Sequence, residues 1–126
     1  MASKNDELVA IKLGAYTADT DETLKRDAYG FREGMSREDA LKSAKGWWKL
    51  NASRAIACEY LVALAGPDNK VVAVGRIRGV LKGDTRGARC AFIADLVQDS
   101  PWYGLSVNRV KSQNPVSYIA VDSIGD

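Results

Sequence analysis

The stretch KGWWKLNASR, residues 45–54, places two adjacent tryptophans among basic side chains. An indole face can stack on a nucleobase, which contributes roughly 1–3 kcal/mol per base, while neighbouring cations bind the phosphates. Trp47 and Trp48 are therefore candidate base-stacking residues, and Lys45, Lys49 and Arg54 are candidate phosphate ligands. The alternative interpretation is that both rings fill the core and that the cations form a solvated face.

A second aromatic group lies in SPWYGLSVNR, residues 100–109. Trp102 and Tyr103 could form the opposite wall of a ligand cleft, with Ser106, Asn108 and Arg109 offering hydrogen bonds. The same segment also fits a loop at the end of a strand, because it begins with a serine and a proline that favour a turn. Its aromatic rings would then cover the sheet.

The densest positive stretch is GRIRGVLKGDTRGAR, residues 75–89. Arg76 and Arg78 are two positions apart in an expected strand, so they share one face. That face could follow a phosphate backbone, or it could be the wet side of a hairpin. The glycines here lack the spacing and the following helix of a phosphate-binding loop.

The chain has no histidine, which excludes an imidazole general base, a histidine-based catalytic triad and a histidine-ligated zinc site. Lys49 and Glu59 could still supply a nucleophile and an acid/base group, but nothing in the sequence fixes their geometry. Cys58 and Cys90 lie in apolar surroundings and are expected to be reduced core thiols. We expect no metal, no cofactor and no catalytic activity.

Length and composition indicate one globular domain spanning residues 1–126. Apolar residues make up 46% of the chain and charged residues 27%, with a net charge of +2, which is too small to indicate nucleic-acid binding without local patches. No apolar run reaches membrane-spanning length, and no signal peptide is recognisable. We therefore expect a cytoplasmic protein that is not membrane-bound.

The elements that must position these residues are mostly strands. Residues 17–27 are expected to form a polar connection, and residues 37–45 a helix that Ser36 and Asp39 begin with a capping box and Gly46 ends. Asn51 or Ser53 could cap a second short turn over residues 54–58. Alternating or apolar runs bounded by turn residues predict strands at 7–14, 59–65, 70–80, 88–97 and 115–121.

Several hairpins with an early helical insertion predict an α+β fold. We expect a small, highly curved β-barrel with two or three short helices packed at one end.

Four segments resemble the PUA-like superfamily, in particular its EVE, ASCH and YTH types of pseudobarrel and uncharacterised bacterial members. They are RDAYGFREGMSREDALKSAKGWWKLN (26–51), RAIACEYLVAL (54–64), VVAVGRIRGV (71–80) and QNPVSYI (113–119). The resemblance covers roughly residues 29–121. It implies recognition of RNA, or of DNA carrying a modified base, in a cleft between helices and barrel that aromatic rings bound.

Together these observations predict a non-catalytic nucleic-acid-binding module that recognises an unpaired or modified base in RNA or DNA. Two alternatives stay open. One is a small hydrolase acting on modified nucleosides, as some ASCH-type proteins do. The other is a protein-interaction module of a bacterial or phage defence system.

Overall fold

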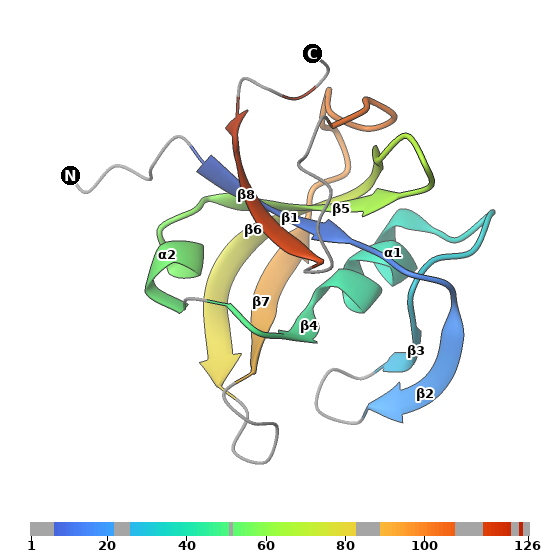
Figure 1. Ribbon diagram of the computed structural model, residues 1–126, viewed down its shortest axis with the longest axis horizontal. Coiled ribbons are helices and arrows are strands. Elements are labelled where there is room, and N and C mark those ends of the chain that lie inside the picture. The colour runs from blue at the N-terminus through green and yellow to red at the C-terminus, as the bar shows by residue number, and fades with distance from the viewer. Residues whose placement is uncertain are drawn as a thin grey trace.

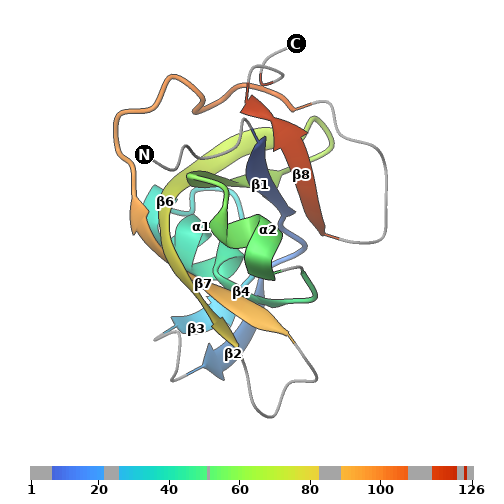
Figure 2. The same ribbon diagram turned by 90° about the vertical axis from the view of Figure 1, so that its left-hand side faces the viewer.

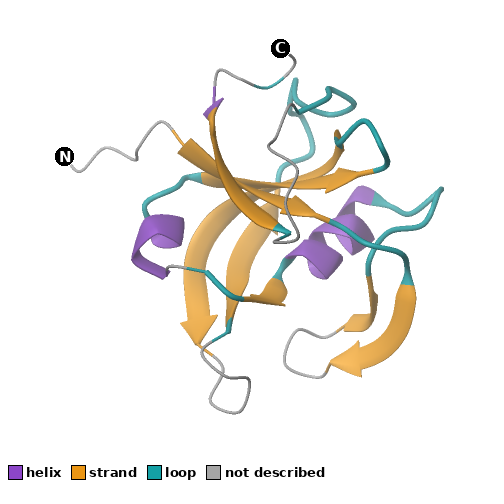
Figure 3. Cartoon of the chain, viewed as in Figure 1, coloured by secondary structure: helices purple, strands orange, loops and turns teal. Residues whose placement is uncertain are grey.

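A computed structural model describes residues 7–21, 26–50, 52–82, 89–107, 115–121 and 124 of the 126-residue chain. Most of the described residues belong to strands and the turns between them, and the two helices are short (Figure 3). In chain order the strands are β1 (Glu7–Lys12), β2 (Thr17–Asp21), β3 (Arg26–Tyr29), β4 (Gly46–Trp48), β5 (Tyr60–Ala65), β6 (Lys70–Lys82), β7 (Cys90–Leu96) and β8 (Val116–Ala120). The helices are α1 (Arg37–Ala44) and α2 (Ala52–Ile56).

Six strands form one curled sheet in the order β4-β7-β6-β5-β1-β8 (Figure 1). Only β1 and β5 run parallel, with Val9 opposite Leu61, and the other neighbours are antiparallel. The long strand β6 carries a register shift against β7 between Ile77 and Gly79. Because a bulge bends its strand and increases the local twist, β6 and β7 can curl around the helices, as Figure 2 shows.

Helix α1 packs against β5, β6 and β7 and also contacts β3, while α2 contacts β6. The Ser36 side chain accepts a hydrogen bond from the Asp39 backbone N–H at 3.1 Å and thereby caps α1. Leu41 on the apolar stripe of α1 lies against Gly75 of β6, where a side-chain carbon on residue 75 would lie 2.7 Å from Leu41 Cδ1. The helix can approach the sheet this closely because Gly75 has no side chain.

Apolar residues line both faces of the central strands. In β5, Leu61 and Ala63 join a cluster beneath the helices, whereas Val62 and Leu64 join a second cluster on the opposite face. Strand β1 alternates in the same way. Since a strand points successive side chains to opposite faces, a continuous apolar run such as YLVALA indicates a strand covered on both sides.

The small α+β curved sheet with two short helices confirms the coarse fold expected from the sequence. Five predicted strands and the helix at 37–45 occur within a few residues of their expected bounds. Cys58 and Cys90 are buried and are not joined in a disulfide, as expected. No helix in the described part of the chain has the length and apolarity needed to cross a membrane.

Two local predictions were wrong. The expected polar connection at 17–27 contains the two strands of a hairpin, β2 and β3. The last helical residue of α1 is Ala44 and its cap is Lys45, one residue before Gly46. Of the two candidate caps for the second helix, Ser53 lies inside α2 and does not cap it, whereas Asn51 falls outside the described residues and stays a prediction. Strand β6 continues to Lys82, two residues beyond the strand predicted at 70–80.

Candidate functional site

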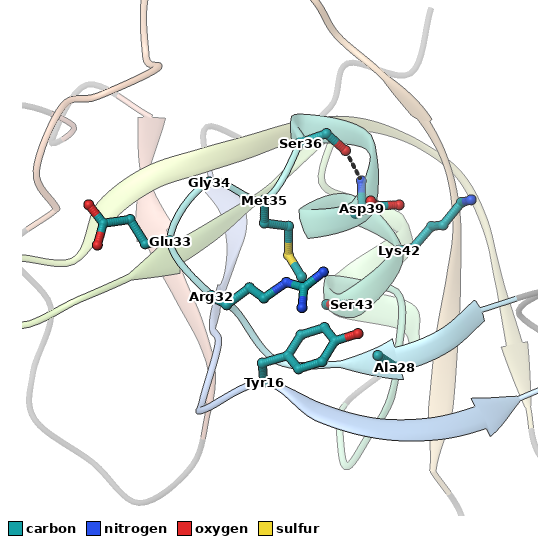
Figure 4. Close-up of a pocket in the computed structure, with 10 residues that line it drawn as sticks. All are labelled: Tyr16, Ala28, Arg32, Glu33, Gly34, Met35, Ser36, Asp39, Lys42 and Ser43. Atoms are coloured by element: carbon teal, nitrogen blue, oxygen red, sulfur yellow. Dashed lines mark hydrogen bonds between the residues drawn. The ribbon is translucent and has the colours of Figure 1, made fainter.

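A hollow of about 740 Å³, the largest of the three described for this structure, lies between α1 and the β2–β3 hairpin (Figure 4). A volume of this size falls within the usual range for small-molecule sites. Four segments contribute the lining: the approach to β2, strand β3, the loop between β3 and α1, and one face of α1. The lining residues are Tyr16, Ala28, Arg32, Glu33, Gly34, Met35, Ser36, Asp39, Lys42 and Ser43.

One wall of this cleft is a ring with a cation stacked on it. Arg32 Cζ lies 4.4 Å from the centroid of the Tyr16 ring, and Tyr16 is 37% exposed. Figure 4 shows the Arg32 side chain passing above the ring toward the middle of the cleft. A guanidinium is planar and stacks on aromatic faces, and it keeps its N–H donors available at its edge. The pair therefore offers a flat surface together with a positive charge.

Backbone pairing brings Tyr16 and Arg32 together although they are far apart in sequence. The Phe31 N–H donates to Gly14 O at 2.9 Å, and Ala15 and Phe31 form an isolated parallel bridge. Gly30, at φ +85°, makes room for this approach, because a side-chain carbon there would lie 2.1 Å from Ala15 O. Residues 14–16 and 30–32 consequently run side by side.

The opposite wall is polar and belongs to α1. Asp39, Lys42 and Ser43 lie on one face of the helix because they are three and four residues apart. Ser43 is only 3% exposed and lies at the base of the cleft, whereas Asp39 is exposed. The Lys42 ammonium is 3.9 Å from the Glu38 carboxylate. The helical wall thus presents a carboxylate, an ammonium and a hydroxyl, which can accept from and donate to a polar ligand.

The two adjacent tryptophans lie outside this cleft. Trp48 Nε1–H donates to Ala44 O at 2.8 Å, and the ring packs against the cluster beneath the helices. Trp47 is half-buried, as is Lys45, whose carbonyl accepts from the Phe92 N–H at 2.6 Å. Lys49 is exposed. Neither tryptophan lines any of the three hollows described for this structure.

Trp102 and Tyr103 pack against the second apolar cluster. Trp102 meets Tyr60 edge to face with ring centroids 5.4 Å apart. The Tyr103 hydroxyl accepts from the Val74 N–H at 3.2 Å and donates to Val97 O at 2.5 Å. Tyr103 also lines a hollow of about 330 Å³ next to the cleft. Ser106 is exposed, while Asn108 and Arg109 fall outside the described residues.

Each of the three predicted phosphate-binding arginines pairs with a carboxylate of the chain. Arg54 makes two hydrogen bonds to Glu7, from Nε at 3.2 Å and from Nη2 at 2.6 Å. These bonds lower the pKa of Glu7 and raise that of Arg54. Arg76 Nη2 lies 3.4 Å from the Glu59 carboxylate, and Arg78 Nε lies 2.5 Å from the Asp95 carboxylate. All three arginines are at least half exposed in their side chains.

Glu59, the acid/base candidate, is engaged in the same network. A hydrogen bond to its carboxylate is the main cause of the raised pKa of Tyr60, with burial adding to the effect. Among the described residues, no group of three or more carboxylates and thiols is arranged to hold a metal ion.

Comparison with known proteins gave no relative: no family model, no curated protein and no solved structure matches the chain.

Sequence reasoning did not find the cleft as a site. Ser36 and Asp39 predict only a helix cap, and Tyr16 and Arg32 carry no motif. The available signal was weak: a tyrosine and an arginine each follow a glycine-containing break, and the face of the predicted helix at 39, 42 and 43 is polar. Only the pairing of Gly14 and Ala15 with Phe31 makes them one site.

Proposed function

We propose that the protein binds nucleic acid non-catalytically and holds one unpaired or modified base in the cleft between α1 and the β2–β3 hairpin. The observation that carries the proposal is the stacking of the Arg32 guanidinium on Tyr16, with Cζ 4.4 Å from the ring centroid. This pair forms one wall of the cleft of about 740 Å³. A base can extend this stack, with a contribution of roughly 1–3 kcal/mol. The cleft is also the place in this fold where a helix meets a strand pair beside an exposed aromatic ring.

The helical wall supports a base in particular. A nucleobase carries ring and exocyclic donors and acceptors along its edges, and carboxylate and hydroxyl groups are suited to pair with them. The lining includes the cations Arg32 and Lys42 and the anions Glu33 and Asp39, so the charges in the cleft nearly balance. Such a balance suits a neutral ring with polar edges better than a bare phosphate.

Calorimetric titration of the purified protein with nucleoside monophosphates, short single strands and duplexes tests the proposal at several salt concentrations. We expect binding that weakens as salt rises, because cations on the protein displace counterions from the nucleic acid. Arg32→Ala should weaken binding about tenfold, which corresponds to about 1.4 kcal/mol. Tyr16→Ala should weaken it by a similar factor, through loss of the stacking surface.

Arg89→Ala is the matched control, because Arg89 is an exposed arginine that lines none of the described hollows. It removes the same charge and should change the affinity less than threefold. Equal losses from Arg32→Ala and Arg89→Ala would show a diffuse charge effect and refute the cleft as the site. Absence of binding by the unsubstituted protein, or binding insensitive to salt, would refute the proposed function itself.

A further inference from the structure

Three hollows of the protein are linked by lining residues that they share. The cleft described above and the hollow of about 330 Å³ share Met35 in their linings. That second hollow shares Phe31 with a third, of about 490 Å³, beside the β5–β6 turn. Met35 and Phe31 lie in the loop between β3 and α1, and this loop therefore borders all three hollows. We name the three together the groove.

Each hollow of the groove combines an aromatic ring with a cation. In the first these are Tyr16 and Arg32, as described. In the second, Arg37 Cζ lies 3.7 Å from the centroid of the Tyr103 ring. The third is lined by Phe31 and Lys12. Repeated pairs of ring and cation are the usual means by which proteins hold successive bases and phosphates of a single strand.

The charge of the groove is uneven along its length. The first hollow has two cations and two anions in its lining. Among the residues that the structure describes, Arg37 and Lys12 are the only charged side chains that line the second and third hollows. A nucleotide chain carries a phosphate for every base. The second and third hollows therefore complement the negative charge of a nucleotide backbone that leads away from the base held in the first hollow.

Hydrogen bonds within the protein hold the cations of the second and third hollows, Arg37 and Lys12, in position. Arg37 Nη1 donates to Gln98 O at 3.0 Å, which leaves other N–H groups of its guanidinium to meet a ligand. Lys12 Nζ donates to Gly66 O and, at 2.7 Å, to Asn69 Oδ1. Because these side chains are ordered before binding, a ligand has less conformational entropy to remove when it binds.

From this geometry we infer that the groove binds a single strand of roughly four nucleotides, with its specific base in the first hollow and its flanking nucleotides in the other two. The inference rests on the proposed function and extends it: the ligand is an extended single strand, and the residues of the second and third hollows contribute affinity without reading the specific base.

Length dependence of binding tests the inference. Oligouridylates and oligothymidylates of one, two, four, six and eight nucleotides are titrated into the protein at one low and one physiological salt concentration. We expect affinity to rise at least tenfold between one and four nucleotides and to change little beyond six. The ribose and deoxyribose series distinguish RNA from DNA as the source of the strand.

Arg37→Ala and Arg37→Lys should flatten this length dependence and leave the affinity for the mononucleotide within about twofold of that of the unsubstituted protein. The lysine variant keeps the charge but loses the planar stack on Tyr103, so it separates stacking from charge. Arg89→Ala is again the control and should preserve the length dependence. Thermal unfolding of each variant shows that the comparison is made on folded protein.

The outcomes separate this inference from the proposed function. If the mononucleotide binds as tightly as the octamer, the groove inference is overturned and the cleft still stands as a base-binding site. If duplexes bind as tightly as single strands of the same length, the inference is overturned as well. If neither mononucleotides nor oligonucleotides bind, both the inference and the proposed function fail.

Discussion

The Arg37 guanidinium lies 3.7 Å from the centre of the Tyr103 ring, and this contact joins the first turn of α1 to the segment that follows β7. The same arginine donates to Gln98 O, and the Tyr103 hydroxyl bridges Val74 and Val97. Helix, loop and β6 are therefore connected through two side chains. Because Arg37 and Tyr103 also line the groove, a change in the packing of this loop alters the shape of the groove.

Tyr103→Phe should destabilise the fold by about 1–3 kcal/mol, because the Val74 N–H and the Val97 carbonyl both lose the hydroxyl as a partner. Urea unfolding followed by circular dichroism measures the change. Tyr16→Phe is the matched control, because the Tyr16 hydroxyl makes no hydrogen bond to any residue that the structure describes. Equal unfolding midpoints for the two variants would show that the bridge does not contribute to stability.

Gly75→Ala should lower stability by about 1–3 kcal/mol, because the added carbon would lie 2.7 Å from Leu41 Cδ1 in the closely packed contact between α1 and β6. Leu41 is buried, so the end of its side chain must shift within the packed interior to accept the added carbon. Gly14→Ala is the control, since nothing lies within 4 Å of a carbon added there. A Gly75→Ala protein as stable as Gly14→Ala would mean that α1 packs less tightly on the sheet than this contact indicates.

Glu7→Gln should destabilise the protein at neutral pH and have a decreasing effect as the solution is acidified. The hydrogen bonds from Arg54 hold the pKa of Glu7 below its ordinary value of 4.5. The carboxylate therefore contributes its full stabilisation above pH 4.5, and the contribution is lost as the pH falls through the lower pKa of the folded state. Urea unfolding at a series of pH values from about 7 to about 3 measures this difference.

The control for Glu7 is Glu33→Gln, because Glu33 makes no ion pair with any residue in the described ranges. Its stability difference from the unsubstituted protein should stay small at every pH. A difference between Glu7→Gln and the unsubstituted protein that grows on acidification would contradict the sign expected here.

Cys58 and Cys90 should react with a thiol reagent only when the protein unfolds, because they are 0% and 3% exposed. A chromogenic disulfide reagent should detect two thiols in denaturant and almost none in the native protein. Ser53→Cys provides a positive control, since residue 53 is exposed on α2. Rapid labelling of both Cys58 and Cys90 in the native protein would show that the packing around these thiols opens readily.

The main sheet could be predicted from the sequence because its strands carry strong local signals. YLVALA and VVAVGRI are apolar or alternating and are separated by GPDN, a turn composition. Ser36 and Asp39 predicted the start of α1 because capping is a short-range interaction. In contrast, TADTD lacks the apolar alternation of a half-buried strand, and it becomes β2 only by pairing with β3.

The cleft could not be predicted for a related reason. Tyr16 meets Arg32 because Gly14 and Ala15 pair with Phe31, and no local pattern encodes that pairing. The tryptophans had the stronger sequence signal. Their composition suits both stacking on a ligand and packing in a core, and only the fold shows Trp48 bonded to Ala44 and packed beneath the helices.

The position of β1 between β5 and β8 has a consequence for how the chain folds during synthesis. Strand β1 precedes both of its neighbours in the chain: β5 follows about fifty residues later, and β8 is complete only when residues 116–120 emerge from the ribosome. Until then its backbone groups on that side stay unpaired and available to other chains. We therefore expect slow folding, in which β8 pairs late with β1 and completes the sheet.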